Sequence, residues 1–190
     1  MKPLNGIKVI DLTHMLAGPY AGMVIADLGA EVVKVEPLAT GEMTRGLLKS
    51  DPNYSYKEFG AYFLTLNRNK KSVSLDLKSE EGLEVFYDLV KSADVVLNNF
   101  SAGVVKKLKV DFESLKKINP RIVTCSITGF GETGPHASRP AYDQIVKAYS
   151  GGMSITGPDV NTPTRAGIPI GDLGSGLYSV IGILSALLSR

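Results

Sequence analysis

The 190-residue chain contains a single cysteine, Cys125, which excludes a disulfide within the chain. Free thiols are typical of reducing compartments, so we expect a cytoplasmic protein. Cys125 lies inside the apolar run 122–127. Free cysteines in such runs behave as small buried hydrophobes, and we interpret Cys125 as an inert thiol rather than a nucleophile.

Targeting segments and long hydrophobic runs are also missing. The N-terminus, MKPLNGIKVIDLT, lacks the apolar region and small-residue cleavage site of a signal peptide. No stretch reaches the roughly 18 consecutive apolar residues that a membrane span needs. We therefore expect a soluble protein with no membrane partner.

The charge balance is too mild to indicate a nucleic-acid partner. The formal net charge is +2, and charged residues make up 21% of the chain. No basic run alternates with aromatic residues, as binding of single strands would require. With 44% hydrophobic residues, the composition is that of an ordinary globular protein.

Short β-branched runs alternate with helical patterns through the first two thirds of the chain. We predict strands at 8–12, 31–35, 72–77, 94–97 and 121–127, and helices at 17–28, from Ser79 as N-cap to about 90, at 102–108 and at 112–118. The stretch 36–67 shows no clear pattern, and we predict it to be irregular. The regular alternation predicts the α/β class, with a Rossmann-like, doubly wound parallel sheet.

The composition changes after Thr128, where glycine and proline become frequent. We predict a helix at 142–149, a loop at 151–171 and a final helix at 177–188 that Asp172 opens. This final helix is apolar nearly all round, so it requires burial on several sides. Either it packs deep inside this domain, or the residues that cover it lie on a missing segment or another chain, which we favour.

The first turn between strand and helix, THMLAGPYAG, lacks a dinucleotide fingerprint. Gly18 and Gly22 do not have the G-x-G-x-x-G spacing that brings backbone to a pyrophosphate, and Pro19 intervenes. A Walker-type phosphate loop is absent as well. These absences argue strongly against an NAD-dependent enzyme.

The segment GIPIGDLGSG places one carboxylate, Asp172, at a junction between loop and helix. On spacing alone, an N-cap is the better interpretation, because aspartate is favoured there. A catalytic carboxylate is the alternative, since the neighbouring glycines leave room for a bulky thioester. Free backbone N–H groups near the helix start could then receive an oxyanion.

The histidines and basic residues give weaker signals. His14 and His136 have no partners at metal-ligand spacing, so we predict no metal site. His14 is either a pocket residue or a simple turn residue. Two basic clusters flank predicted strands, and each is either solvated surface or a site for an anionic nucleotide. The clusters are Arg68, Lys70, Lys71 and Lys78, and Lys106, Lys107 and Lys109.

Four stretches in order resemble the family III CoA-transferases. They are PLNGIKVIDLTHMLAGPYAGMVIADLGAEVVKVE, NRNKKSVSLDLKSEEGLEVFYDLVKSADVVLNNF, NPRIVTCSITGFGETGP and GIPIGDLGSGLYSVIGILSALL. The family includes formyl-CoA transferase, the carnitine CoA-transferases and α-methylacyl-CoA racemase. The resemblance covers essentially the whole chain but only about the first half of such a protein. It implies that residues 1–190 are the N-terminal part of the large Rossmann-like domain.

The resemblance implies that Asp172 is the catalytic carboxylate, which forms covalent aspartyl intermediates while CoA moves between an acyl-CoA and a carboxylic acid acceptor. It also implies an interlocked homodimer, or pairing with a separately encoded C-terminal half. The positions that match the family's CoA-binding segments are Leu16, Ala17, Leu75, Asp76, Leu77, Lys78, Asn99, Phe100, Lys107, Tyr142 and Asp143.

Three departures from the family pattern bear on the activity. Tyr142-Asp143 stands where the racemases carry His-Asp, which weakens the prediction of a racemase. Leu16 replaces the glutamine of formyl-CoA transferase, which puts oxalate in doubt as substrate. Pro37 replaces an arginine of some members, so adenine contacts differ. The alternatives that remain are a racemase-like isomerase and a CoA-binding fragment without catalysis.

Overall fold

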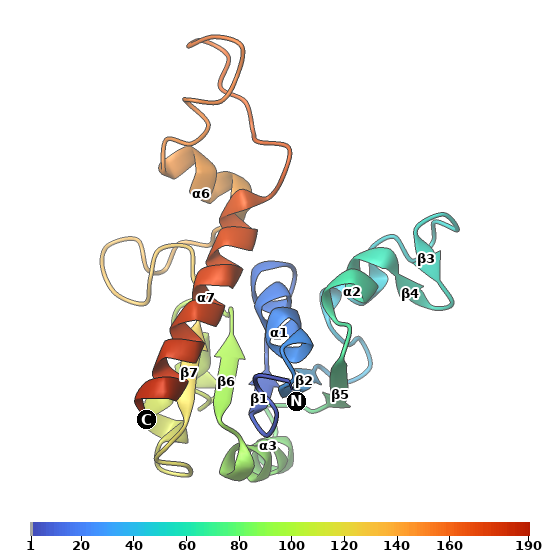
Figure 1. Ribbon diagram of the computed structural model, residues 1–190, viewed down its shortest axis with the longest axis vertical. Helices are drawn as coiled ribbons and strands as arrows, with labels where there is room; N and C mark the ends of the chain where they lie inside the picture. Colours follow the sequence, from blue (N-terminus) through green and yellow to red (C-terminus); the bar gives the residue numbers. More distant parts are fainter. Residues whose placement is uncertain (1) are drawn as a thin grey trace.

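The computed structural model describes residues 2–190 as a parallel sheet with helices on both faces (Figure 1). The sheet has five strands in the order β5-β2-β1-β6-β7, and every neighbouring pair is parallel. The strands are β1 (Lys8–Asp11), β2 (Glu31–Glu36), β5 (Lys70–Ser74), β6 (Val95–Asn98) and β7 (Val123–Ser126). This arrangement confirms the predicted Rossmann-like, doubly wound α/β fold.

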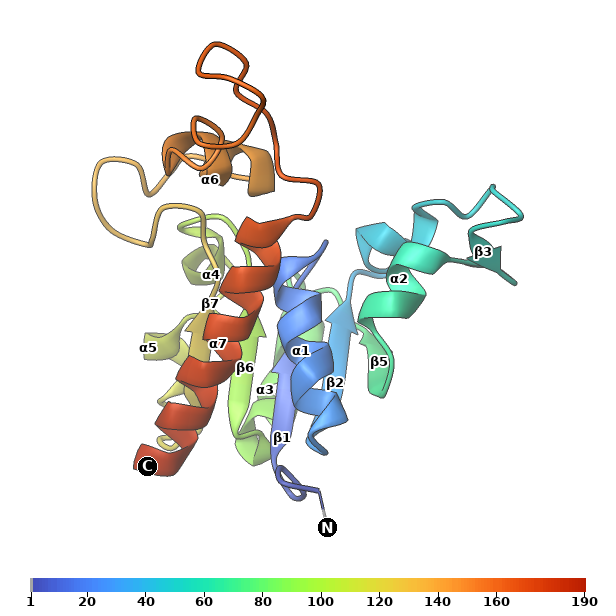
Figure 2. The ribbon, with the colours of Figure 1, turned by 45° about the horizontal axis from the view of Figure 1, so that its top comes forward.

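The helices form a layer on each face of the sheet (Figure 2). Helices α1 (Ala17–Asp27) and α7 (Ile170–Ser189) lie side by side on one face, and α3 (Glu80–Ser92), α4 (Val104–Lys107) and α5 (Phe112–Leu115) lie on the other. Successive strand residues point to opposite faces, so Val9 packs beneath α1 and α7 while Ile10 packs against α3. Each face therefore has its own apolar core.

The start of α3 confirms a prediction made from local sequence. The Ser79 hydroxyl accepts a hydrogen bond from the Gly82 N–H at 3.0 Å, as an N-cap does. Glu80 and Glu81 occupy the first turn, where the helix dipole favours negative charge.

The prediction that 36–67 is irregular is wrong. The stretch contains a 3-10 helix η1 (Met43–Gly46), a short hairpin of β3 (Ser55–Tyr56) and β4 (Phe59–Gly60), and α2 (Ala61–Leu66). These elements project beyond the β5 side of the sheet (Figure 1). Elements of two to six residues are too short to show a periodicity.

Helix α7 begins at Ile170, seven residues before its predicted start, so Asp172 lies within the first turn and Pro169 is the N-cap. By length and composition this 20-residue helix is apolar enough to cross a membrane, contrary to our expectation, although core helices of soluble proteins also meet that test. One side packs on α1 and the sheet through Gly176, Val180 and Ile183.

The other side of α7 is open. Tyr178 is 77% exposed and Leu188 is 89% exposed. Leu177 and Ile181 are exposed as well. The helix therefore does not pack deep inside this domain, and its apolar outer side remains uncovered by residues 2–190.

Cys125 lies half-buried in β7, under α7. Burial raises the pKa of its thiol, which disfavours the reactive thiolate and agrees with an inert cysteine.

Candidate active site

The strand order reverses direction between β1 and β6, because the chain first adds strands on one side of β1 and then on the other. In open α/β sheets, ligands bind in the crevice beyond the carboxyl ends of the two strands at such a point. Here β1 leads into the turn 12–16 and β6 into Asn99 and Phe100. The predicted site residues on these two segments are thereby brought together.

Asn99 joins the two segments through the main chain of His14. Its Oδ1 accepts the His14 N–H at 2.8 Å, and its Nδ2 donates to the His14 carbonyl at 2.7 Å. One side chain thus satisfies both polar groups of a residue that lies outside the sheet ladder. The position of the turn relative to β6 is set by these two hydrogen bonds.

Two charged side chains hold the rest of the turn, and the sequence analysis missed both. Glu42 accepts the Met15 N–H at 2.8 Å, and the Lys34 ammonium donates to the Thr13 carbonyl at 2.7 Å. Met15 has a φ of 66°, a left-handed conformation that non-glycine residues rarely adopt without such support. A lysine inside the apolar run EVVKV was the one available signal.

Lys34 belongs to a buried ion network centred on Asp11. The Asp11 carboxylate lies 2.8 Å from Lys70 Nζ and 3.8 Å from Lys34 Nζ, and all three side chains are nearly inaccessible to solvent. Burial alone raises the pKa of Asp11, but the two ammonium groups and the hydrogen bonds from Lys70 and Thr13 lower it to about 2. Asp11 is therefore ionised at neutral pH.

This network changes the interpretation of the first basic cluster. Lys70 pairs with Asp11, Lys71 pairs with Glu31 at 2.8 Å, and Arg68 pairs with Asp27. The two lysines lie at the amino end of β5, away from the crevice. Lys78, the fourth residue of this cluster, lines a cavity there.

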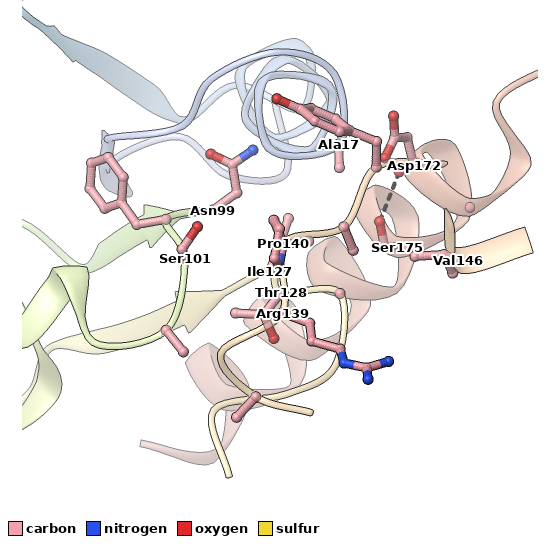
Figure 3. Close-up of a pocket in the computed structure, with 17 residues that line it drawn as sticks. Ala17, Asn99, Ser101, Ile127, Thr128, Arg139, Pro140, Val146, Asp172 and Ser175 are labelled. Carbon is pink, nitrogen blue, oxygen red and sulfur yellow. Dashed lines mark hydrogen bonds between the residues drawn. The ribbon is translucent and has the colours of Figure 1, made fainter. Parts of the chain in front are cut away.

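Three adjoining cavities follow the carboxyl edge of the sheet. One of about 440 Å³ is lined by Leu16, Ala17, Asn99, Tyr142 and Asp172, and one of about 470 Å³ by Leu75, Asp76, Leu77, Lys78 and Phe100. His14 and Pro37 line both. A third cavity of about 160 Å³ lies beside Asp172, Asn99 and Arg139 (Figure 3). Nine of the eleven residues matched to CoA-binding segments line these three cavities, which together form a groove; the two that do not are Lys107 and Asp143.

Lys107 and Asp143 lie outside the cavity linings. Lys107 is exposed at the end of α4. Two neighbours on this segment, Val104 and Leu108, line the 470 Å³ cavity. Asp143 is 7% exposed, at the start of α6 (Asp143–Tyr149). Its carboxylate faces α7 rather than the groove, as its contacts below indicate.

Asp172 presents an unpaired carboxylate to the groove. Among residues 2–190, no hydrogen bond is made to its side-chain oxygens, whereas its main-chain carbonyl accepts one from the Ser175 hydroxyl at 3.0 Å (Figure 3). Partial burial raises the pKa of Asp172, the nearby Asp143 raises it further, and Lys147 opposes both. Burial raises the pKa of Tyr62, and the negative charge of Asp172 raises it further, so Tyr62 is a neighbour of Asp172 that the sequence did not indicate.

Asp143 orients the start of α7. It accepts the Gly171 N–H at 2.8 Å and pairs with Lys147 at 2.6 Å, and Lys147 donates to the Ile168 carbonyl at 2.7 Å. Free backbone N–H groups near the start of this helix were expected to be able to receive an oxyanion. The Gly171 N–H is not one of them, because it already donates to Asp143. Asp172 is held one residue beyond this anchor.

The glycines around Asp172 have different roles. A Cβ on Gly174 would meet no atom within 4 Å, which agrees with room for a thioester. A Cβ on Gly176 would lie 2.7 Å from the Ala17 carbonyl oxygen. Gly176 therefore permits the close contact of α7 with α1 rather than substrate entry.

We expect Asp143→Asn to lower the pKa of Asp172. The substitution removes a neighbouring negative charge and leaves the Lys147 ammonium, so the ionised form of Asp172 is favoured. Carbon-13 NMR titration of the Asp172 carboxyl group measures this directly. Asp159→Asn, in an exposed loop, is the control and should leave the titration unchanged. An Asp172 pKa that stays constant or rises in Asp143→Asn would contradict the assignment.

The sequence model of CoA-transferase family III matches residues 4–190. The chain belongs to this family. It is 43% identical over 190 residues to succinyl-CoA:glutarate CoA-transferase of Mus musculus, covering 100% of this chain and 43% of that protein. It is 43% identical over 189 residues to formyl-CoA:oxalate CoA-transferase of Streptomyces coelicolor, covering 100% of this chain and 45% of that protein.

A solved structure agrees with the family assignment. The crystal structure of a CAIB/BAIF family protein from Brucella suis matches with a TM-score of 0.93 and 45% identity, over 100% of this chain and 50% of that one. The chain thus spans about half the length of the family III relatives it matches.

Proposed function

We propose that this chain transfers CoA between an acyl-CoA thioester and a carboxylic acid, with Asp172 as the nucleophile. The observation that carries the proposal is the unpaired Asp172 carboxylate in a groove at the switch point of the sheet. Burial and the nearby Asp143 raise the pKa of Asp172, and a more basic carboxylate is a stronger nucleophile than an ordinary aspartate. The names of the relatives support the reaction class.

The proposed reaction begins when an Asp172 oxygen attacks the thioester carbon. The C–S bond breaks, which yields an aspartyl anhydride and CoA thiolate. The thiolate then attacks the Asp172 carbonyl carbon, releases the first carboxylic acid and leaves an aspartyl-CoA thioester. The acceptor carboxylate then attacks the carbonyl carbon of the aspartyl thioester, the C–S bond breaks, and a second anhydride and CoA thiolate form. The thiolate attacks the acceptor carbonyl carbon of this anhydride, which yields the new acyl-CoA and releases the Asp172 carboxylate. Each step exchanges one acyl bond for another, so no external energy source is needed.

We propose that the CoA lies along the groove, with its thioester near Asp172 and its phosphates toward Lys78. The 440 Å³ cavity contains Asp172, and the 470 Å³ cavity contains Lys78. Lys107, exposed on α4 beside the second cavity, is a further cation for the phosphates. Leu16, Ala17, Asn99 and Phe100 would line the path between the two ends.

The open apolar side of α7 supports a partner in the assembled protein. We propose that either a second copy in an interlocked homodimer or a C-terminal half covers Leu177, Tyr178 and Ile181. A CoA-binding fragment without catalysis is the alternative function, since the chain spans about half of its relatives.

Trapping with hydroxylamine tests the covalent step. The chain is incubated with succinyl-CoA, treated with hydroxylamine and digested, and the peptides are analysed by mass spectrometry. We expect a hydroxamate on Asp172, because hydroxylamine attacks activated acyl groups but not free carboxylates. Omission of the acyl-CoA is the control. Saturable CoA binding without any hydroxamate would favour the non-catalytic alternative.

A further inference from the structure

His14 lies where the two larger cavities meet. Its side chain lines both the cavity of Asp172 and the cavity of Lys78. The ring centroid is 5.7 Å from that of Phe100, which lines the Lys78 cavity. Both main-chain polar groups of His14 are bound to Asn99, so the backbone beneath the ring is fixed.

The imidazole has no hydrogen-bond partner within residues 2–190. Its Nδ1 is shielded from solvent and unpaired. Buried polar atoms in folded proteins nearly always have a partner, so an orphaned ring nitrogen beside two cavities requires an explanation. Within residues 2–190 no hydrogen bond holds the ring orientation, so a turn of the ring about the Cβ–Cγ bond toward the groove would break none.

Burial of the His14 ring favours its neutral form. Burial lowers the pKa of His14, and the Lys34 ammonium lowers it further, whereas Glu42, Asp11 and Glu36 oppose the shift. A neutral imidazole carries one donor and one acceptor. It matches a neutral amide better than a phosphate or a carboxylate, which prefer cationic donors.

We propose that the His14 imidazole hydrogen-bonds an amide of the pantetheine arm as bound acyl-CoA passes from one cavity to the other. This inference rests on the proposed function. Asp172 accounts for the thioester end of the ligand and Lys78 for its phosphates, and the segment between them is the amide-bearing arm. The hydrogen bond would satisfy the nitrogen that the folded chain leaves unpaired.

Calorimetry with two ligands tests this assignment. CoA carries the pantetheine arm, whereas adenosine 3′,5′-bisphosphate has the same nucleotide phosphates without it. We expect His14→Phe to weaken CoA binding about 10-fold, as the loss of one hydrogen bond does, and to leave the bisphosphate unaffected. His14→Gln, which keeps a donor and an acceptor, should recover most of the CoA affinity.

Nitrogen-15 NMR of the His14 ring gives a second measurement on the unmodified chain. Its ring resonances should shift on addition of CoA and stay in place with adenosine 3′,5′-bisphosphate. Unchanged CoA binding in His14→Phe with unshifted resonances would overturn the inference alone. An equal loss for both ligands would assign His14 a structural role and overturn it as well. If the unmodified chain binds no CoA, the proposed function fails together with this inference.

Discussion

Asp172→Ala should reduce CoA exchange by roughly 10⁴-fold or more, as loss of the nucleophile does in other covalent enzymes. The variant has no group that can form the anhydride or the aspartyl thioester. The assay follows transfer of CoA from succinyl-CoA to an isotopically labelled acid by mass spectrometry. CoA binding, measured separately, should persist, because the proposed contacts to the nucleotide lie elsewhere in the groove.

The fold should tolerate this substitution. The Asp172 side chain makes no hydrogen bond within residues 2–190, and its proximity to Asp143 is repulsive. Asp159→Ala, in an exposed loop, is the matched control and should keep full exchange. Exchange that continues unchanged in folded Asp172→Ala would refute the catalytic role of this residue.

Asp11→Ala should lower the free energy of unfolding by about 3–5 kcal/mol, the usual cost of removing one partner from a buried ion pair. The substitution leaves the Lys34 and Lys70 ammonium groups buried without their shared counter-ion. It also removes the hydrogen bonds that Thr13 donates to the carboxylate at 2.8 Å and 2.5 Å. Urea unfolding followed by circular dichroism measures the loss.

Asp27→Ala is the matched control for Asp11→Ala. Asp27 also pairs with a cation, Arg68, but that pair is partly exposed to solvent. Exposed ion pairs contribute roughly 0–1 kcal/mol, so this variant should remain close to the unmodified chain. Equal losses of unfolding free energy in the two variants would show that burial does not determine how much the Asp11 network contributes to stability.

The Asp11 network also links stability to the site. Lys34 holds both Asp11 and the Thr13 carbonyl, and the turn that follows Thr13 carries His14, Leu16 and Ala17 into the groove. Loss of the Asp11 charge is therefore expected to move the residues proposed to contact CoA.

Local patterns in the sequence predicted much of the fold. The alternation of β-branched runs and helical stretches predicted the five parallel strands, and Ser79 with Glu80 and Glu81 predicted the start of α3. Most of the residues proposed to bind CoA came from the family resemblance rather than from spacing. On spacing alone, Asp172 was better explained as an N-cap, which the structure shows to be wrong because Pro169 is the N-cap.

The amino-acid sequence by itself determined the α/β class, the family and the position of Asp172 near a helix start, because these follow from periodicity and motifs within short windows. Only the tertiary structure decided which charges are buried and which groups are left unpaired. Asp11 and Lys70 are 59 positions apart, and Met15 and Glu42 are 27 apart. Such pairs form only when strands and loops that are distant in the chain come together in the fold, and no pattern within a short stretch of sequence predicts which of them do.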